Sequence, residues 1–150
     1  LWGLRDAGCA EDDIILVHDG VRPLVAERII TENIEKCRKY GYAITGMICK
    51  EAIMQKVDDC VKNIDIPRER LVRTQTPHTY PLGTLLKAHA EADAKGIDGT
   101  VASCTLMAEL GVDNQHLVMG SEKNGLKLTQ TEDVELFKAL KHTTKDEWLK

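Results

Sequence analysis

The pattern of hydrophobic and polar positions predicts alternating strands and helices in the first third of the chain. Residues 14–17 are apolar without a polar break, which is typical of a strand buried on both faces in a parallel sheet. Apolar residues then recur at helical spacing from Ala26 to Cys37, with charges on the other face, and predict an amphipathic helix that ends near Gly41. Residues 42–48 predict the next strand. Strand, helix and strand in this order indicate a βαβ unit with a right-handed crossover.

A polar segment at about 50–66 interrupts this regular pattern. It has no helical stripe, and its few apolar residues are scattered among charges, so we expect an extended arm or hairpin that protrudes from the sheet. Residues 62–65 are either the second strand of this arm or a loop. An isolated arm of this kind is only marginally stable and needs a partner surface. The chain is therefore expected to form a homodimer through the arm.

The remainder of the chain predicts further helices around one short strand. Pro81 opens a helix, Gly111 ends the next one, and Thr129 and Glu132 have the spacing of a capping box for the closing helix. The predicted elements outside the segments above are a short helix over 1–7, a helix over 82–95, a helix over 101–110, a strand over 116–119, a strand-like piece over 126–128, a helix ending at His142 with Val134, Phe137 and Leu140 facing inward, and a polar tail to Lys150.

Composition and charge limit the class of protein. The 150 residues are 43% hydrophobic and 29% charged, so they can bury the core of one domain spanning 1–150. A net charge of −4 and an aromatic content of 4% give no basic face, so no nucleic-acid partner is expected. No apolar run has the length of a membrane span, and the first residues do not resemble a signal peptide. The five cysteines form no CxxC motif, which disfavours a disulfide framework or a zinc site and favours free thiols in the cytoplasm.

The candidate chemistry begins where the first strand stops. In open α/β sheets ligands bind at the carboxyl ends of strands, and Asp19 follows the strand over 14–17 directly after His18. A carboxylate there can hold a hard cation, Gly20 lets a ligand approach the backbone, and Arg22 offers a fork of donors to phosphate. An ordinary strand-to-loop turn with a surface aspartate and arginine explains the same spacing, so both interpretations stay open on these residues alone.

Four motifs occur together in order, and their set is more specific than any member. They are Val17-His18-Asp19-Gly20-Val21-Arg22-Pro23, Arg73-Thr74-Gln75-Thr76-Pro77, Leu126-Lys127-Leu128-Thr129 and Glu132-Asp133. With these motifs the chain resembles, over essentially its whole length, the cytidylyltransferases that activate polyol phosphates. That family includes 2-C-methyl-D-erythritol 4-phosphate cytidylyltransferase of isoprenoid synthesis and ribitol-5-phosphate cytidylyltransferase of teichoic-acid and capsule synthesis.

The resemblance implies a Rossmann-like three-layer α/β nucleotidyltransferase fold with a protruding β-arm, and it implies CTP, Mg²⁺ and a polyol phosphate as ligands. Asp19 matches the aspartate that takes part in binding the metal and the nucleotide phosphates, and Gly20 lies beside it in the nucleotide-binding motif. Arg22 and Lys127 match basic residues near the reacting phosphates and are the catalytic candidates. On spacing alone, an exposed strand lysine is the favoured interpretation of Lys127.

The resemblance also implies substrate contacts from the arm of a neighbouring subunit. Arg68 matches by spacing the arginine that reaches the polyol phosphate, with Arg70 and Arg73 as rivals, although Arg68 beside Glu69 is also a plausible surface pair. Ala52 stands where methylerythritol-type members carry a threonine in the arm. The reaction brings two anions together, since a substrate phosphate attacks the α-phosphate of CTP and pyrophosphate leaves. Fixed positive charge and positioning therefore carry most of the catalysis.

The chain departs from the family pattern in ways that matter for function. It contains no glycine-rich loop for the CTP triphosphate, and the nearest glycines, Gly3 and Gly8, lie at a helix end. We therefore expect an incomplete fold, the C-terminal portion of a single domain, that does not turn over by itself. The alternative is a non-catalytic piece that keeps only the dimerisation arm and part of the polyol-phosphate site. Three further departures make methylerythritol phosphate a doubtful substrate: Ala52, Val21, and the lack of the acidic residue that such members usually carry near Ala102.

His18 and Asp19 allow one further hypothesis, the dyad of a metal phosphohydrolase. Such dyads lie on helices with more histidine ligands at helical spacing, whereas this pair ends a strand. The other histidines show no such spacing; they are His78, His89, His116 and His142.

Overall fold

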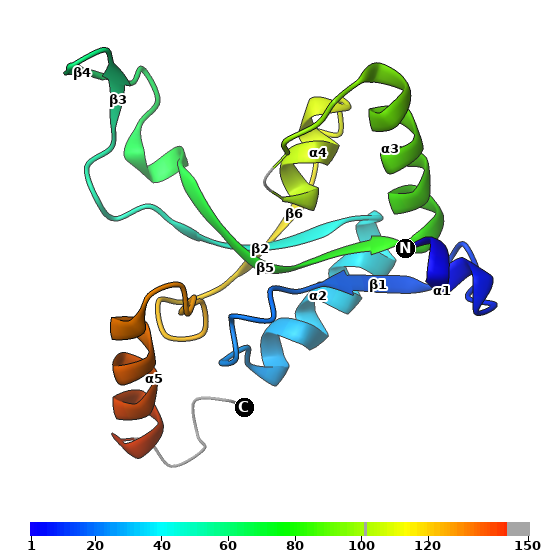
Figure 1. Ribbon diagram of the computed structural model, residues 1–150, viewed down its shortest axis with the longest axis horizontal. Helices are drawn as coiled ribbons and strands as arrows, with labels where there is room; N and C mark the ends of the chain where they lie inside the picture. Colours follow the sequence, from blue (N-terminus) through cyan, green and yellow to red (C-terminus); the bar gives the residue numbers. More distant parts are fainter. Residues whose placement is uncertain (101, 144–150) are drawn as a thin grey trace.

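The computed structural model describes residues 1–100 and 102–143, which are arranged around a four-stranded mixed sheet with helices (Figure 1). In spatial order the strands are β1 (Ile14–Val17), β5 (Val72–Pro81), β2 (Ala43–Ile48) and β6 (His116–Met119). Both β1 and β2 pair antiparallel with β5, so they run parallel to each other, and β6 pairs parallel with β2. The expected α/β fold class is confirmed.

The first strand is placed as predicted, but its surroundings differ from the prediction. β1 pairs only with β5 among the described strands, and β5 lies between the two strands of the expected βαβ unit. The strand is therefore not buried on both faces in a parallel sheet: Ile14, Ile15 and Leu16 are half-buried, and Val17 is 36% exposed. Its continuous apolar run did not distinguish a central strand from one with a single strand neighbour.

Helices cover both faces of the sheet. On one face α2 (Glu27–Tyr40) buries Ile29 and Cys37 against Ala43 and Val118. On the other face α3 (Leu82–Lys95) and α4 (Ser103–Glu109) bury Leu85, Ala88 and Met107 around Tyr80. Ala43 and the next residue, Ile44, belong to opposite clusters because successive strand residues point to opposite faces. The α2 helix ends at Gly41 with φ 91°, a conformation that favours glycine.

A buried polar network joins α2 to the two central strands. The side-chain amide of Asn33, which is fully buried, donates to the Ile29 carbonyl at 2.7 Å and to the Thr45 hydroxyl at 2.9 Å. Thr45 in turn donates to the Pro77 carbonyl at 2.8 Å, and Thr79 donates to Asn33 Oδ1 at 3.3 Å. Because every member has a partner, the network fixes the position of the helix over the sheet without leaving a buried polar group unpaired.

The polar segment after β2 forms the predicted arm. β3 (Met54–Val57) and β4 (Cys60–Asn63) make an antiparallel hairpin that stands away from the sheet (Figure 1). All the residues of both strands are exposed. A short 3₁₀ helix, η1 (Arg68–Arg70), returns the chain to β5.

The two ends of the chain carry smaller elements. The predicted first helix is present as α1 (Trp2–Asp6). Residues 126–128 are not a strand, which corrects the prediction; instead Leu128 N–H donates to the Val21 carbonyl at 2.8 Å. The closing helix, α5 (Thr131–Thr143), lies apart from the sheet in Figure 1. Its predicted inward residue Val134 is 38% exposed.

The cap of α5 also differs from the predicted capping box. Asp133, not Glu132, accepts hydrogen bonds from the backbone N–H groups of Thr129 and Gln130, both at 2.8 Å. These bonds hold the pKa of Asp133 below its usual range. The predicted tail to Lys150 and the first residue of the helix predicted over 101–110 lie outside the described residues. No described helix is long and apolar enough to cross a membrane.

Candidate functional site

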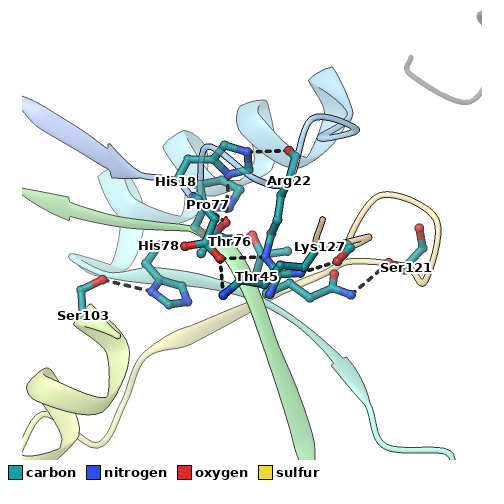
Figure 2. A network of polar contacts seen from close by, with 12 residues as sticks. His18, Arg22, Thr45, Thr76, Pro77, His78, Ser103, Ser121 and Lys127 are labelled. Atoms are coloured by element: carbon teal, nitrogen blue, oxygen red, sulfur yellow. Dashed lines mark hydrogen bonds and ion pairs between the residues drawn. The ribbon is translucent and has the colours of Figure 1, made fainter. Parts of the chain in front are cut away.

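The loop at the end of β1 is held in place by His18 (Figure 2). His18 Nε2 lies 2.9 Å from the Arg22 carbonyl, which can only accept, so Nε2 carries a proton. In the neutral ring, Nδ1 then accepts from the Thr76 hydroxyl at 3.0 Å. Thr76 Oγ1 also accepts from the backbone N–H of Asp19 at 3.1 Å. His18 and Thr76 therefore fix the turn that presents Asp19 and Arg22, and both ring nitrogens of His18 are engaged.

A carboxylate and two cations meet at this turn. Arg22 Nε donates to Asp19 Oδ2 at 3.0 Å, and Lys127 Nζ lies 3.3 Å from the same oxygen. Burial alone would raise the pKa of Asp19, but hydrogen bonds and charge from Arg22 and Lys127 outweigh burial and hold that pKa below its usual range. The Arg22 side chain is 13% exposed and that of Lys127 is 45% exposed. Arg22 is thus a fixed charge, whereas Lys127 remains accessible from outside.

The loop that carries Lys127 is packed against β5 and Arg22. Arg22 Nη1 donates to the Gly125 carbonyl, and Gln75 Nε2 donates to the Ser121 carbonyl at 3.0 Å. A Cβ at Gly120 or at Gly125 would lie only 2.0 Å or 1.9 Å from the Gln75 side chain. These two glycines are therefore required for the loop to close over Gln75.

A hollow of about 320 Å³ opens beside this cluster. Asp19, Arg22 and Lys127 line one part of it, and His78 and Ser103 line another. His78 is 2% exposed, and its Nδ1 lies 3.0 Å from the Ser103 hydroxyl. Burial lowers the pKa of His78, and the Gln75 carbonyl only partly opposes this effect. The hollow therefore combines a charged part with a neutral, hydrogen-bonding part.

The structure brings together only some of the residues predicted for the site. Asp19, Arg22 and Lys127 converge as expected. At Gly20 an added Cβ would meet no atom within 4 Å, so the fold itself does not demand glycine there, and its role in approaching a ligand stays a prediction. Gly125 differs from Gly20, because a Cβ at Gly125 would clash with the Gln75 side chain.

The substrate-binding candidates lie elsewhere in the chain. Ala52 and Arg68 line a separate hollow of about 620 Å³ at the base of the hairpin, where Arg68 also contacts the Lys50 carbonyl at 3.3 Å. Arg73 pairs with Glu122 on the exposed side of β5. None of these three side chains lines the hollow beside Asp19 within one chain, so their predicted role depends on a second subunit.

The donor set near Asp19 fits a metal that is held mainly by its substrate. No group of three or more His, Cys, Asp and Glu side chains that could hold a metal occurs among residues 1–100 and 102–143. Mg²⁺ commonly binds through one or two carboxylates, with phosphates and water as the remaining ligands. Arg22 and Lys127 both contact Asp19 Oδ2, which leaves Oδ1 as the oxygen available to such an ion.

Several residues of the hollow had no role in the sequence-based prediction. Thr76 was part of a recognised motif without an assigned function, and His78 and Ser103 were not connected. The signal that could have suggested them is their closeness to the recognised motif, since His78 follows Pro77 directly. Strand alternation is no guide here, because the register of β2 on β5 shifts between Gln75 and His78. The contact between His78 and Ser103 spans 25 residues and depends on how α4 packs on the sheet.

Comparison with known proteins places this geometry in context. The family model described as IspD: 2-C-methyl-D-erythritol 4-phosphate cytidylyltransferase matches residues 4–142. The chain is 42% identical over 134 residues to "Ribitol-5-phosphate cytidylyltransferase" of Lacticaseibacillus paracasei, covering 87% of this chain and 56% of the relative. It is 37% identical over 136 residues to "2-C-methyl-D-erythritol 4-phosphate cytidylyltransferase" of Acidobacterium capsulatum, covering 89% and 56%. The chain thus spans about half the length of these curated relatives.

Solved structures show the same fold. The 2-C-methyl-D-erythritol 4-phosphate cytidylyltransferase of Thermus thermophilus superposes with a TM-score of 0.77 at 27% identity, over 95% of this chain and 67% of that one. The 4-diphosphocytidyl-2C-methyl-D-erythritol synthase of Anaerococcus prevotii superposes with a TM-score of 0.80 at 24% identity, over 94% and 64%.

Proposed function

The chain belongs to the 2-C-methyl-D-erythritol 4-phosphate cytidylyltransferase (IspD) family, and from this premise we propose that it serves the transfer of CMP from CTP to a polyol phosphate, with release of pyrophosphate. D-ribitol 5-phosphate and 2-C-methyl-D-erythritol 4-phosphate are the proposed acceptors, because relatives named for each match the chain. The observation that carries the proposal is the convergence of Asp19, Arg22 and Lys127 on one hollow.

The arrangement suits a reaction between two phosphates. Their mutual repulsion has to be offset before an acceptor oxygen can approach the α-phosphorus of CTP. Arg22 is held rigidly by Asp19 and by the Gly125 carbonyl, so its charge needs no reorganisation when a phosphate arrives. Lys127 is accessible and can exchange part of its contact with Asp19 for a phosphate oxygen.

Mg²⁺ is the proposed metal, and Asp19 is the residue that would hold it. When bound, the ion neutralises charge that develops on the phosphate oxygens. The role of this chain's own residues is to bind and orient: Asp19 fixes the two basic side chains, and His18 and Thr76 fix Asp19.

The hairpin is proposed as the homodimer contact, with Arg68 and Ala52 contributing to the site of the partner subunit. Two facts support this. The hairpin strands are fully exposed, with apolar side chains among them such as Met54 and Val61. Arg68 also lies on the hairpin hollow, outside the hollow beside Asp19.

A second candidate function is polyol-phosphate binding without turnover. It is favoured by one observation: the cationic hollow is formed by the chain, whereas its 150 residues include no glycine-rich loop for a triphosphate. We propose that the isolated chain binds the polyol phosphate and does not release pyrophosphate.

The test is a calorimetric titration of the chain with each polyol phosphate and with Mg²⁺–CTP, together with a pyrophosphate-release assay. Lys127→Gln should weaken polyol-phosphate binding by about tenfold, the effect of one charged hydrogen bond. Lys95→Gln, at an exposed lysine paired with Glu91 on α3, is the matched control and should leave the affinity unchanged. Equal affinities for wild type and Lys127→Gln would contradict the site. CTP-dependent pyrophosphate release would overturn the second candidate and support turnover by the chain itself.

A further inference from the structure

His78 carries a buried ring nitrogen with no hydrogen bond of normal geometry in the described part of the chain, although the Gln75 backbone lies near enough to affect the pKa of the ring. The residue lies in β5 and is 2% exposed, with Nδ1 engaged by the Ser103 hydroxyl at 3.0 Å. Nε2 has no hydrogen-bond partner within residues 1–100 and 102–143. Buried polar groups in native proteins are almost always paired, so an unpaired one needs an explanation.

The unpaired nitrogen belongs to a ring that lines the hollow beside Asp19. Figure 2 shows His78 and Ser103 on one side of the polar cluster and Arg22 and Lys127 on the other. The hollow of about 320 Å³ has the volume of roughly ten water molecules at about 30 Å³ each, enough for a small phosphorylated molecule. A ligand whose phosphate meets the cations can therefore reach His78 with its remaining atoms.

We propose that His78 Nε2 hydrogen-bonds a hydroxyl group of the polyol chain and thereby determines specificity for hydroxylated phosphate esters. The inference rests on the proposed function, because it takes the polyol phosphate as the ligand of this hollow. His78 lies outside the set of residues that the family resemblance assigned to the site, so it adds a contact to that set.

The hydrogen-bonding chemistry of His78 matches an alcohol better than a phosphate. The Ser103 hydroxyl can donate to Nδ1 or accept from it, so Nε2 is a donor in one tautomer and an acceptor in the other. An alcohol hydroxyl serves in both cases, whereas an ionised phosphate oxygen only accepts. Burial favours the neutral ring, which offers no charge to a phosphate. A ligand without the hydroxyl would leave Nε2 buried and unpaired, and such sites reject the deoxygenated analogue strongly.

The experiment compares D-ribitol 5-phosphate with n-pentyl phosphate, an ester of the same chain length without hydroxyl groups, by calorimetry on the 150-residue chain. Wild type should bind D-ribitol 5-phosphate at least about tenfold more tightly. His78→Leu should reduce this preference by about tenfold while leaving the affinity for n-pentyl phosphate unchanged. His78→Gln, which can still hydrogen-bond, should recover part of the preference. The same series with 2-C-methyl-D-erythritol 4-phosphate tests the second acceptor.

The outcomes separate this inference from the proposed function. If D-ribitol 5-phosphate binds and His78→Leu leaves its preference over n-pentyl phosphate unchanged, the inference is overturned and the proposed function stands. If neither polyol phosphate binds wild type, both are overturned.

An NMR measurement on the wild-type chain tests the same contact without relying on the folding of the variants. The ¹⁵N shift of His78 Nε2 should change with D-ribitol 5-phosphate and stay constant with n-pentyl phosphate. A constant shift with both ligands, as expected if only water fills the space, would overturn the inference.

Discussion

The central sheet and the β3–β4 hairpin are both built on antiparallel pairing, yet they differ in what covers them. Between β2 and β5 the backbone ladder is covered by helices, and the Asn33 network is sealed beneath α2. In the hairpin every residue of both strands is exposed. An isolated two-stranded hairpin is only marginally stable in water. The helix-covered sheet is therefore expected to be stable within one chain, whereas the hairpin needs another surface to pack against.

This difference divides the proposed site in two. Asp19, Arg22 and Lys127 belong to the sheet side and converge within one chain. Arg68 and Ala52 belong to the hairpin side and line a different hollow. The sheet side is therefore expected to bind phosphate as a single subunit, and the hairpin side to act only across a dimer.

The largest difference should appear when the buried network is broken. Asn33→Ala leaves the Thr79 hydroxyl without its acceptor and opens a small cavity, so we expect a loss of about 3 kcal/mol in the free energy of unfolding. Val61→Ser on the hairpin should change it by less than about 0.5 kcal/mol. Urea unfolding measures both. Similar losses for the two variants would mean that the hairpin is as firmly packed as the sheet.

A second prediction separates a glycine that the fold needs from the glycine that is predicted to let a ligand approach. Gly125→Ala places a Cβ 1.9 Å from Gln75 Nε2, and relieving that clash should cost about 2 kcal/mol in stability. Gly20→Ala meets no atom within 4 Å and should change stability by less than about 0.5 kcal/mol. Thermal unfolding of the two alanine variants checks the contrast. Equal melting temperatures would contradict the packing of the Lys127 loop on Gln75.

A third prediction concerns the Asp19 cluster and acid. Because the pKa of Asp19 is lower in the folded chain than its ordinary value of 3.8, the ionised carboxylate stabilises the fold above that pH. This contribution is lost as the pH falls below 3.8 through the folded-state pKa. Asp19→Asn should therefore cost about 1 kcal/mol or less at neutral pH, where the pair is partly exposed. The difference in the free energy of unfolding between wild type and Asp19→Asn should narrow in urea titrations as the pH is lowered below 3.8. A difference that stays constant with pH would contradict the ion pair.

A fourth and smaller effect is expected at His78. Its pKa is lowered by burial, so below the ordinary value of 6.5 the unfolded chain takes up a proton more readily than the folded one. Wild type should lose stability as the pH falls from 6.5 toward the folded-state pKa, and His78→Gln should lose less. Melting temperatures from pH 7.5 to 5.0 for the two proteins test this. If the melting temperatures of both proteins change with pH in the same way, burial does not lower the pKa of His78.

Local patterns predicted the elements well and their arrangement less well. The charged face of α2 and Gly41 located that helix, and the polar composition of 50–66 located the hairpin. The insertion of β5 between β1 and β2 could not be predicted, because strand order depends on pairing between residues far apart in sequence. The apolar run of β1 suggested a central strand, because a local pattern carries no information on how many strands pair with it.

The site was predictable to a similar extent. Asp19 and Arg22 stand in one motif, and the family resemblance added Lys127. The contact of His78 with Ser103 had no local signature, since it forms only when α4 packs against β5. The α5 cap was assigned to Glu132 although Asp133 makes it, because α5 begins at Thr131, and Asp133 is the acid three residues after Gln130, the residue that precedes the helix.

The most direct test of the proposed site is an amide chemical-shift map of the chain titrated with D-ribitol 5-phosphate. The largest changes are expected at Asp19, Arg22, Thr76 and Lys127, around the hollow of about 320 Å³. Changes confined to the larger hollow at the base of the hairpin, around Ala52 and Arg68, would contradict it.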